Sequence, residues 1–346
     1  MLLNFKTIFW ENGKVKILDQ TALPAKVVYQ AITTTEEMTQ AIKTMKVRGA
    51  PLIGVAAAYG VVLSATLPKD VSYDEFKKEV KRGIAIIANT RPTAYNLFAA
   101  LDRMRKILES ENDPNVAKLK LIEEAEQIRK EDERICQKIG ENGESLLPDN
   151  SKVLTHCNAG ALATAGIGTA LAPIYLAKEK GKYIEVFTSE TRPLLQGARL
   201  TAWELTANKI PVTLICDSAV GVVLRNKRVD LCIVGADRIA SNGDTANKIG
   251  TYSMAVLAKE NGIPLYVAAP STTFDRNIES GADIPIEERS EYEITKLSYG
   301  SIAPQGIRCF NPAFDVTPAK YITAFITDRG ILKPPFEQSI HRLFPQ

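Results

Sequence analysis

Five short apolar runs alternate with helical segments in the second half of the chain, and this alternation limits the possible folds more than any other feature of the sequence. Strands that alternate with helices form parallel sheets with helices on both faces. The sequence therefore predicts an α/β protein with a doubly wound parallel sheet. The five runs are 153–155, 184–188, 212–215, 231–234 and 265–268.

The first part of the chain predicts a different architecture. Residues 5–10 and 14–18 flank Glu11-Asn12-Gly13, a turn sequence typical of a β-hairpin. Segments with helical spacing of apolar residues follow, and the last of them is long and charged, which suits a connector. Because 346 residues exceed one typical domain, we predict an N-terminal domain at 1–130 and a second domain with the parallel sheet at 131–346. The predicted helices are 35–46, 52–65, 73–88, 94–110 and 117–146.

Composition excludes several classes of function. The formal net charge is +3 without a run of lysines or arginines, so we expect no nucleic-acid partner. No segment approaches the roughly 20 apolar residues of a membrane helix, so we expect no membrane contact. The chain has only two histidines, so it offers few ligands for a zinc or iron centre. The five cysteines show no CxxC spacing and no secretory signal is evident, so we expect reduced thiols in the cytoplasm.

Cys157 lies where the first apolar strand of the predicted sheet ends. In an open α/β sheet, ligands bind in the crevice at the carboxyl ends of the strands. We predict a glycine-spaced helix over 165–176, whose free N–H groups and positive dipole end would lower the thiol pKa from about 8.5. The alternative is a structural thiol, since free cysteine is often buried as a small apolar residue.

Asp237 follows the fourth predicted strand and precedes a Gly-Asp loop. Partial burial of its carboxyl group would raise the pKa and make it a candidate general acid. The alternatives are a helix N-cap and a salt bridge to Arg238. Asn247 and Lys248 are predicted to open a helix, where an amide, an ammonium group and free N–H groups would bind a sugar hydroxyl or a phosphate. Ordinary helix capping is their alternative role.

Two arginines stand beside prolines at predicted helix starts. Arg48 precedes Gly49-Ala50-Pro51, and a proline at the first helical position leaves neighbouring N–H groups free to face an anion. The Arg48 guanidinium suits a phosphate, although a turn whose arginine pairs with a surface carboxylate is equally consistent. Arg91 lies in the similar stretch Asn-Thr-Arg-Pro-Thr. No GxGxxG follows the first strand of the sheet, which disfavours a nicotinamide cofactor.

Together these motifs resemble the methylthioribose-1-phosphate isomerase family of methionine salvage. The similarity extends from about residue 48 to residue 331. This family shares a superfamily with archaeal ribose-1,5-bisphosphate isomerase and with the regulatory subunits of translation initiation factor 2B. The motifs are VRGAPLIGVAAAYG, NTRPTAYNL, THCNAGALATAGIGTAL, ETRPLLQGARLTAWEL, DSAVG, GADRIASNGDTANKIGTY, PIEER and NPAFDVTPAKYIT.

The resemblance implies a fold, a reaction and a set of site residues. The fold would be a small N-terminal domain joined to a Rossmann-like domain, as a homodimer. The reaction would be an aldose–ketose isomerisation of a phosphorylated sugar without a cofactor or metal, with Cys157 and Asp237 as the catalytic pair. Ribose-1,5-bisphosphate isomerase and a non-catalytic regulatory subunit remain alternatives, and a nicotinamide dehydrogenase is a more distant one. The substrate contacts would be Arg48, Gly49, Ala50, Arg91, Gln196, Asn247 and Lys248.

Overall fold

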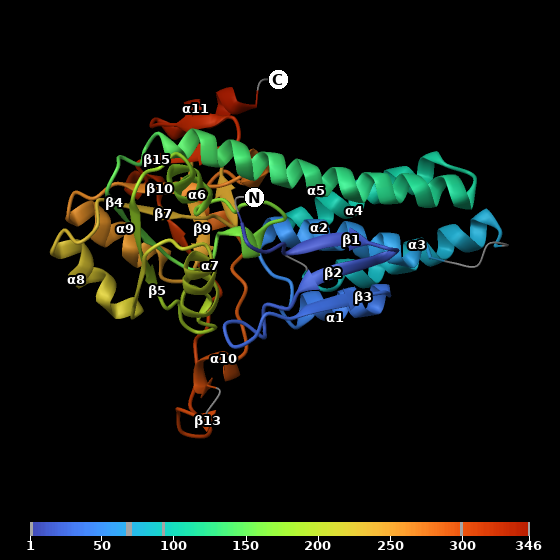
Figure 1. The fold of residues 1–346 in the computed structure, drawn as a ribbon, viewed down its shortest axis with the longest axis horizontal. Helices are drawn as coiled ribbons and strands as arrows, with labels where there is room; N and C mark the ends of the chain where they lie inside the picture. Colours follow the sequence, from blue (N-terminus) through green and yellow to red (C-terminus); the bar gives the residue numbers. More distant parts are fainter. Residues whose placement is uncertain (1–2, 67–70, 92–93, 298–299, 345–346) are drawn as a thin grey trace. The chain divides into compact units, whose positions relative to one another are not determined.

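The computed structural model describes residues 3–66, 71–91, 94–297 and 300–344 (Figure 1). Pro92 and Thr93 of the Arg91 motif lie outside the described residues. The chain forms two compact units, which we describe separately. The first unit contains residues 3–136 and 161–168, and the second contains 137–160 and the chain from 169 onward. The predicted fold class, with an N-terminal hairpin, a helical region and a parallel sheet, is confirmed.

A three-stranded antiparallel sheet opens the first unit. Strands β1 (Ile8–Glu11) and β2 (Lys14–Leu18) form the predicted hairpin, with Ile8 opposite Ile17. The third strand, β3 (Tyr29–Ile32), pairs with β2 and was not predicted. Its four residues are too few and too polar to show the alternation that identifies a strand in a sequence.

Four α-helices in the described part of the first unit lie wholly within it, and a fifth, α5 (Pro114–Glu144), continues past residue 136 into the second unit. Two of them begin with a capping box, in which a hydroxyl and a glutamate satisfy each other's free N–H groups. Thr34 accepts from the N–H of Glu37 at the start of α1, and Ser72 accepts from that of Glu75 at the start of α3. The helices are α1 (Thr35–Lys43), α2 (Ala50–Ser64), α3 (Tyr73–Ala88), α4 (Tyr95–Ser110) and α5 (Pro114–Glu144).

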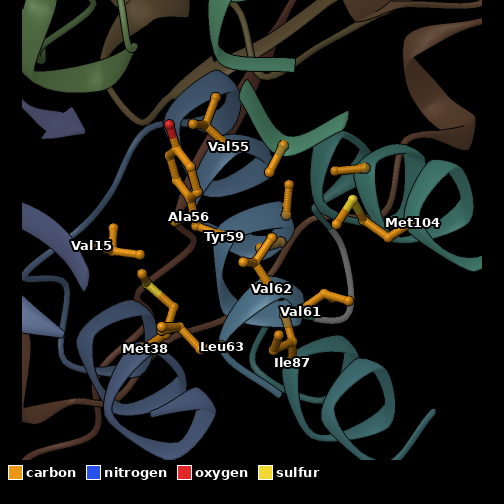
Figure 2. Close-up of a cluster of buried hydrophobic side chains, with 14 of the residues drawn as sticks. Val15, Met38, Val55, Ala56, Tyr59, Val61, Val62, Leu63, Ile87 and Met104 are labelled. Atoms are coloured by element: carbon orange, nitrogen blue, oxygen red, sulfur yellow. The ribbon is translucent and has the colours of Figure 1, made fainter. Parts of the chain in front are cut away.

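Helix α2 is the centre of this unit. Every residue from Leu52 to Ser64 is buried, so the helix is apolar on all sides and packs against neighbours all round. Each of its larger apolar side chains contributes roughly 1.5–3 kcal/mol by leaving water. Side chains of β2, α1, α3 and α4 are among those that surround it. Figure 2 shows this cluster, which includes Val15, Met38, Val55, Tyr59, Val62, Ile87 and Met104.

Residues 161–168 belong to the first unit, although in the chain they follow the first strand of the parallel sheet. The hydroxyl of Thr7 donates to the carbonyl oxygen of Ala161 at 2.8 Å. The side chain of Asp132, on α5, accepts from the N–H of Ala165 at 2.6 Å. These long-range hydrogen bonds explain why the segment leaves the helical path that its apolar spacing predicts.

Asp132 gives the protein a pH-dependent stability. Burial raises its pKa to about 7, although the N–H groups of Ala165 and Gly166 act the other way. The folded state then binds the proton more tightly than the unfolded state, so the contribution of Asp132 to stability falls as pH rises from about 4 to about 7. Asparagine cannot ionise. We therefore expect the melting temperature of Asp132→Asn, relative to wild type, to be higher at pH 8 than at pH 5, and an equal difference at both pH values would contradict this.

The second unit contains a seven-stranded sheet in the order β16-β15-β10-β7-β4-β5-β6. All neighbouring strands are parallel except β16, which is antiparallel to β15. The five predicted strands are confirmed, and β15 and β16 were not predicted. The strands are β4 (Ser151–Thr155), β5 (Ile184–Ser189), β6 (Val212–Ile215), β7 (Leu231–Val234), β10 (Leu265–Ala268), β15 (Ala324–Thr327) and β16 (Gly330–Leu332).

The strand order reverses between β4 and β7. From β4 the chain continues outward through β5 and β6, and it then returns to β7 on the other side before continuing to β10 and β15. This reversal is the topological switch point, the place where open α/β sheets bind their ligands.

A smaller sheet in the order β11-β8-β9-β14 follows the exit of β7. Its strands are β8 (Arg238–Ala240), β9 (Thr245–Lys248), β11 (Phe274–Asp275) and β14 (Phe314–Thr317). A short pair, β12 (Lys296–Leu297) and β13 (Gly300–Ser301), follows α10 (Tyr292–Thr295). The other helices are α6 (Ala172–Glu179), α7 (Ala202–Ala207), α8 (Val220–Arg225), α9 (Thr251–Glu260) and α11 (Phe336–Leu343).

The prediction of a helix over 165–176 is wrong, because α6 begins only at Ala172. The hydroxyl of Thr164 accepts from the N–H groups of Gly166 and Gly168, which directs the backbone away from a helix. None of the helices in the described ranges combines the length and the apolar character that a membrane span requires.

Candidate active site

Cys157 and Asp237 leave the parallel sheet from two adjacent strands. Cys157 comes two residues after β4, and Asp237 comes three residues after β7. The two strands are hydrogen-bonded in parallel, with Leu154 opposite Cys232, and neighbouring strands lie about 4.8 Å apart. Both residues therefore lie at the same edge of the sheet, on the two sides of the switch point.

Cys157 adopts an unusual backbone conformation. Its φ is 63°, in the left-handed region that a residue with a side chain rarely occupies. Its N–H donates to Thr191 Oγ1 at 2.9 Å, and its carbonyl oxygen accepts from Thr201 Oγ1 at 2.6 Å. The prediction of a helix dipole beside Cys157 is wrong, because no α-helix begins directly after Cys157 and α6 starts fifteen residues later. Left-handed backbone conformations of residues with a side chain, such as that of Cys157, are common at functional sites, where the surrounding structure holds them in place.

His156 is buried and connects three segments around Cys157. Its Nε2 lies 2.7 Å from the carbonyl oxygen of Ile249, so Nε2 carries the proton. Its Nδ1 therefore accepts from the Ser189 hydroxyl at 2.6 Å. Burial lowers the pKa of His156 and keeps the ring neutral. Gly250 is required beside the ring, because its φ is 105° and a Cβ would lie 2.9 Å from Cε1 of His156.

Asp237 lies at the start of β8. Its N–H donates to the carbonyl oxygen of Ala246 at 2.9 Å. A strand, not a helix, follows it, so the N-cap alternative is wrong. The guanidinium of Arg238 lies 3.6 Å from the carboxylate of Asp275.

The prediction that Asn247 and Lys248 open a helix is also wrong, because both belong to strand β9. In that strand Asn247 lies opposite Asp315 of β14. Helix α9 begins three residues later, and the Asp315 carboxylate accepts from the N–H groups of Gly250 and Tyr252 at 2.7 and 3.0 Å. A carboxylate thus occupies the helix start that was expected to receive an anion.

The ammonium group of Lys248 interacts electrostatically with both catalytic candidates, Cys157 and Asp237. Its side chain is buried, its Nζ donates to the carbonyl oxygen of Ala313 at 2.6 Å, and the ammonium lies 4.7 Å from the centre of the Phe314 ring. Burial lowers the pKa of Lys248, and the negative charges of Cys157 and Asp237 oppose this shift. The structure therefore brings the sulfur and the carboxylate within electrostatic range of one cation.

This arrangement predicts that Lys248 favours the thiolate of Cys157, since the attraction between the two charges is mutual. We expect Lys248→Met to shift the midpoint of Cys157 alkylation to higher pH, measured by iodoacetamide labelling and peptide mass spectrometry. Lys248→Arg keeps the charge and is the control. An unchanged midpoint in Lys248→Met would contradict the electrostatic contact.

The side-chain oxygen of Gln196 could accept a hydrogen bond from a ligand. It precedes the π-helical turn Gly197–Thr201, and its side chain is 7% exposed. Its Oε1 is buried without a hydrogen-bond partner among the residues that the structure describes. Because an unpaired buried carbonyl oxygen costs roughly 1–3 kcal/mol, a ligand hydroxyl that donates to it would be stabilised there.

The other predicted substrate contacts belong to the first unit. Gly49 precedes α2, which begins at Ala50, and has a φ of 102°. A Cβ at this position would lie 2.6 Å from the backbone of Ala163, so the fold alone requires glycine here. Arg48 directly precedes this turn, and Arg91 follows the end of α3.

Several residues around Cys157 were not predicted from the sequence. Thr191, Thr201, His156 and Ser189 contact Cys157 or one another through side-chain hydrogen bonds. Their position beside the exits of β4 and β5 is the one sequence signal that could have identified them. Among the residues in the described ranges, no cluster of three or more His, Cys, Asp and Glu side chains is placed to hold a metal ion.

Comparison with known proteins agrees with this architecture. The profile of the Initiation factor 2 subunit family matches residues 46–334. A methylthioribose-1-phosphate isomerase from Carboxydothermus hydrogenoformans is 54% identical over 342 residues, which cover 98% of each protein. The chain belongs to the methylthioribose-1-phosphate isomerase family. Another relative of this isomerase family member, from Moorella thermoacetica, is named 5-deoxyribose 1-phosphate isomerase and is 52% identical over 97% of this chain and 96% of its own length.

Solved structures give the same result for the fold of this isomerase family member. The crystal structure of 5-methylthioribose 1-phosphate isomerase from Pyrococcus horikoshii matches with a TM-score of 0.94 and 44% identity, over 99% of this chain and 97% of that chain. A structure described as the delta subunit of translation initiation factor eIF-2B from A. fulgidus matches with a TM-score of 0.91 and 44% identity, over 98% and 99%.

Proposed function

We propose that this protein converts 5-methylthioribose 1-phosphate to 5-methylthioribulose 1-phosphate in methionine salvage. The observation that carries the proposal is the placement of Cys157 and Asp237 at the exits of adjacent strands, on the two sides of the switch point. Family membership supports the substrate, since the relatives from C. hydrogenoformans and P. horikoshii are named for this sugar phosphate.

The chemistry explains why an acid and a base are needed together. In 5-methylthioribose 1-phosphate the anomeric oxygen is esterified, so the ring cannot open to a free aldehyde as in ordinary aldoses. Ring opening therefore needs a proton donor at the ring oxygen, and isomerisation by proton transfer also needs removal of the proton from C2. A carboxylic acid and a thiolate can supply these two functions.

In the proposed mechanism, Asp237 protonates the ring oxygen as the bond from C1 to that oxygen breaks. The thiolate of Cys157 removes the C2 proton, and the C2–H electrons form the C1–C2 double bond of an enol phosphate. The Cys157 thiol then returns a proton to C1 while Asp237 accepts the C2 hydroxyl proton. The product is the C2 ketone, and both side chains return to their starting states.

A direct shift of hydride from C2 to C1 is the competing route. In that route Cys157 would polarise the C2 hydroxyl and no carbon-bound hydrogen would come from water. Turnover in deuterium oxide tests for proton transfer, since deuterium at C1 of the product requires exchange of the abstracted proton with solvent. Retention of the C2 hydrogen at C1 is expected for a hydride shift and also for a Cys157 thiol that returns the same proton before it exchanges.

The remaining predicted residues would bind the substrate. We assign phosphate and sugar contacts to Arg48, Gly49, Ala50, Arg91, Gln196, Asn247 and Lys248. The guanidinium groups suit a phosphate, and the unpaired Oε1 of Gln196 suits a sugar hydroxyl.

We further propose a cytoplasmic homodimer with domains at 1–130 and 131–346. The five cysteines are free thiols, which suits a reducing compartment. Leu214 on the edge strand β6 and Val222 on α8 are 50% and 62% exposed, and such apolar side chains suit contact with a second copy.

A turnover assay tests the proposal and its alternatives. The purified protein is incubated separately with 5-methylthioribose 1-phosphate, 5-deoxyribose 1-phosphate and ribose 1,5-bisphosphate, and ketose formation is followed by NMR. We expect the highest kcat/KM with 5-methylthioribose 1-phosphate. A higher value with either other sugar would overturn the substrate assignment. No turnover of any of the three would favour the regulatory-subunit alternative.

A further inference from the structure

Two buried threonines hold the peptide groups on both sides of Cys157. Thr191 and Thr201 are fully buried, at 0% exposed. The hydroxyl of Thr191 accepts from the Cys157 N–H at 2.9 Å, and the hydroxyl of Thr201 donates to the Cys157 carbonyl oxygen at 2.6 Å. Both threonines come from the segment that follows β5, so one segment holds the catalytic candidate at two points.

Thr201 is itself fixed by a buried polar network. The side-chain amide of Asn158 donates to Thr201 Oγ1 at 3.1 Å and to Glu204 Oε2 at 3.2 Å. The hydroxyl of Tyr175 donates to Glu204 Oε1 at 3.0 Å. Glu204 is fully buried, and a Cβ on Gly160 would lie 1.5 Å from its Oε1. The network therefore joins the loop after β4 to α6 and α7. Its hydrogen bonds and close packing hold each of these side chains in one conformation.

The geometry points to Thr201 as a positioning residue for Cys157, acting with Thr191 and supported by the Asn158–Glu204 pair. The two hydroxyl contacts hold the peptide groups on both sides of Cys157, whose φ is 63°, and thereby fix the direction of the Cα–Cβ bond that carries the sulfur.

The need for such a contact follows from the backbone. A cysteine has no intrinsic preference for the left-handed region, so an unheld loop would return to ordinary φ values and move the sulfur. The main effect of losing the contact would fall on the rate, since displacement of a reacting group by about 1 Å can lower a rate about 100-fold. Substrate binding, which depends on other residues, would change little.

The experiment compares Thr201→Val with Thr201→Ser. Valine keeps the shape and removes the hydroxyl, whereas serine keeps the hydroxyl. Thr327→Val is the matched control, because Thr327 is also fully buried and donates to a backbone carbonyl oxygen, that of Gly330 at 2.8 Å, on β15. The measurements are kcat, KM, the alkylation rate of Cys157 with exposed Cys216 as internal reference, and the melting temperature.

We expect Thr201→Val to lower kcat about 10- to 100-fold with KM changed less than about threefold. Its Cys157 alkylation rate at fixed pH should differ at least about threefold from wild type, while Thr201→Ser and Thr327→Val resemble wild type. Wild-type kcat and alkylation in a folded Thr201→Val would overturn the inference, and so would equal losses of activity in Thr201→Val and Thr327→Val. If Thr201→Val does not fold, Thr191→Val and Thr191→Ser give the same comparison at the Cys157 N–H.

The inference rests on the proposed function, but the two can fail separately. An inactive wild-type protein would remove the isomerase proposal, while the alkylation rates of the Thr201 variants would still test the positioning of Cys157. Active wild type with unaffected Thr201 variants would remove the positioning role alone.

Discussion

Replacing Cys157 by alanine is expected to lower kcat by about 1,000-fold or more, because the variant has no group to remove the C2 proton. Substrate affinity should change less than about threefold, since the proposed phosphate and hydroxyl contacts remain. Isothermal titration calorimetry with 5-methylthioribose 1-phosphate measures affinity, and a stopped NMR assay measures turnover.

Cys216→Ala is the matched control for this experiment. Cys216 is an exposed thiol directly after β6, in the same sheet as Cys157. We expect this variant to keep wild-type kcat. Wild-type turnover in Cys157→Ala would remove the catalytic role of the thiol, and a large loss of affinity in that variant would show that Cys157 serves binding.

Replacing Asp237 by asparagine is expected to lower kcat about 100- to 10,000-fold, because the amide keeps the shape but cannot donate a proton to the ring oxygen. Steady-state kinetics with 5-methylthioribose 1-phosphate measure this loss.

Asp230→Asn is the control for the charge change. Asp230 precedes β7 at its amino end, where its carboxylate accepts from the N–H of Lys152 at 2.7 Å. It therefore tests loss of one carboxylate from the opposite end of the same strand, and we expect near wild-type kcat. Equal losses in Asp230→Asn and Asp237→Asn would assign the effect to structure and not to proton donation.

Most of the fold could be predicted because many of its turns and strands are determined by residues that are close together in the sequence. The Asn12-Gly13 turn and the apolar runs of the parallel sheet each act within a few positions. One of the missed strands, β9, depends on a distant partner. Strand β9 pairs with β14, which lies about seventy residues further along the chain, so a local pattern could not separate Asn247 and Lys248 from a helix start.

The sequence predicted the central pair of the candidate site, Cys157 and Asp237. It did not predict the residues that surround Cys157. Cys157 and Asp237 follow strands, and the general rule for strand exits identified both. The hydroxyl groups that hold Cys157 lie 34 and 44 residues away in the chain, so only the fold brings them together. The helix-dipole explanation for the thiol failed because Thr164 and Asp132 bind the N–H groups that a helix would have used.

The most direct test is a crystal structure of the Cys157→Ala variant soaked with 5-methylthioribose 1-phosphate. The account predicts the ring oxygen of the sugar within about 2.6–3.2 Å of an Asp237 carboxyl oxygen, and C2 directed at Cβ of residue 157 with space for the missing sulfur. A sugar that binds with its ring oxygen away from Asp237, or with C2 facing away from position 157, would contradict it.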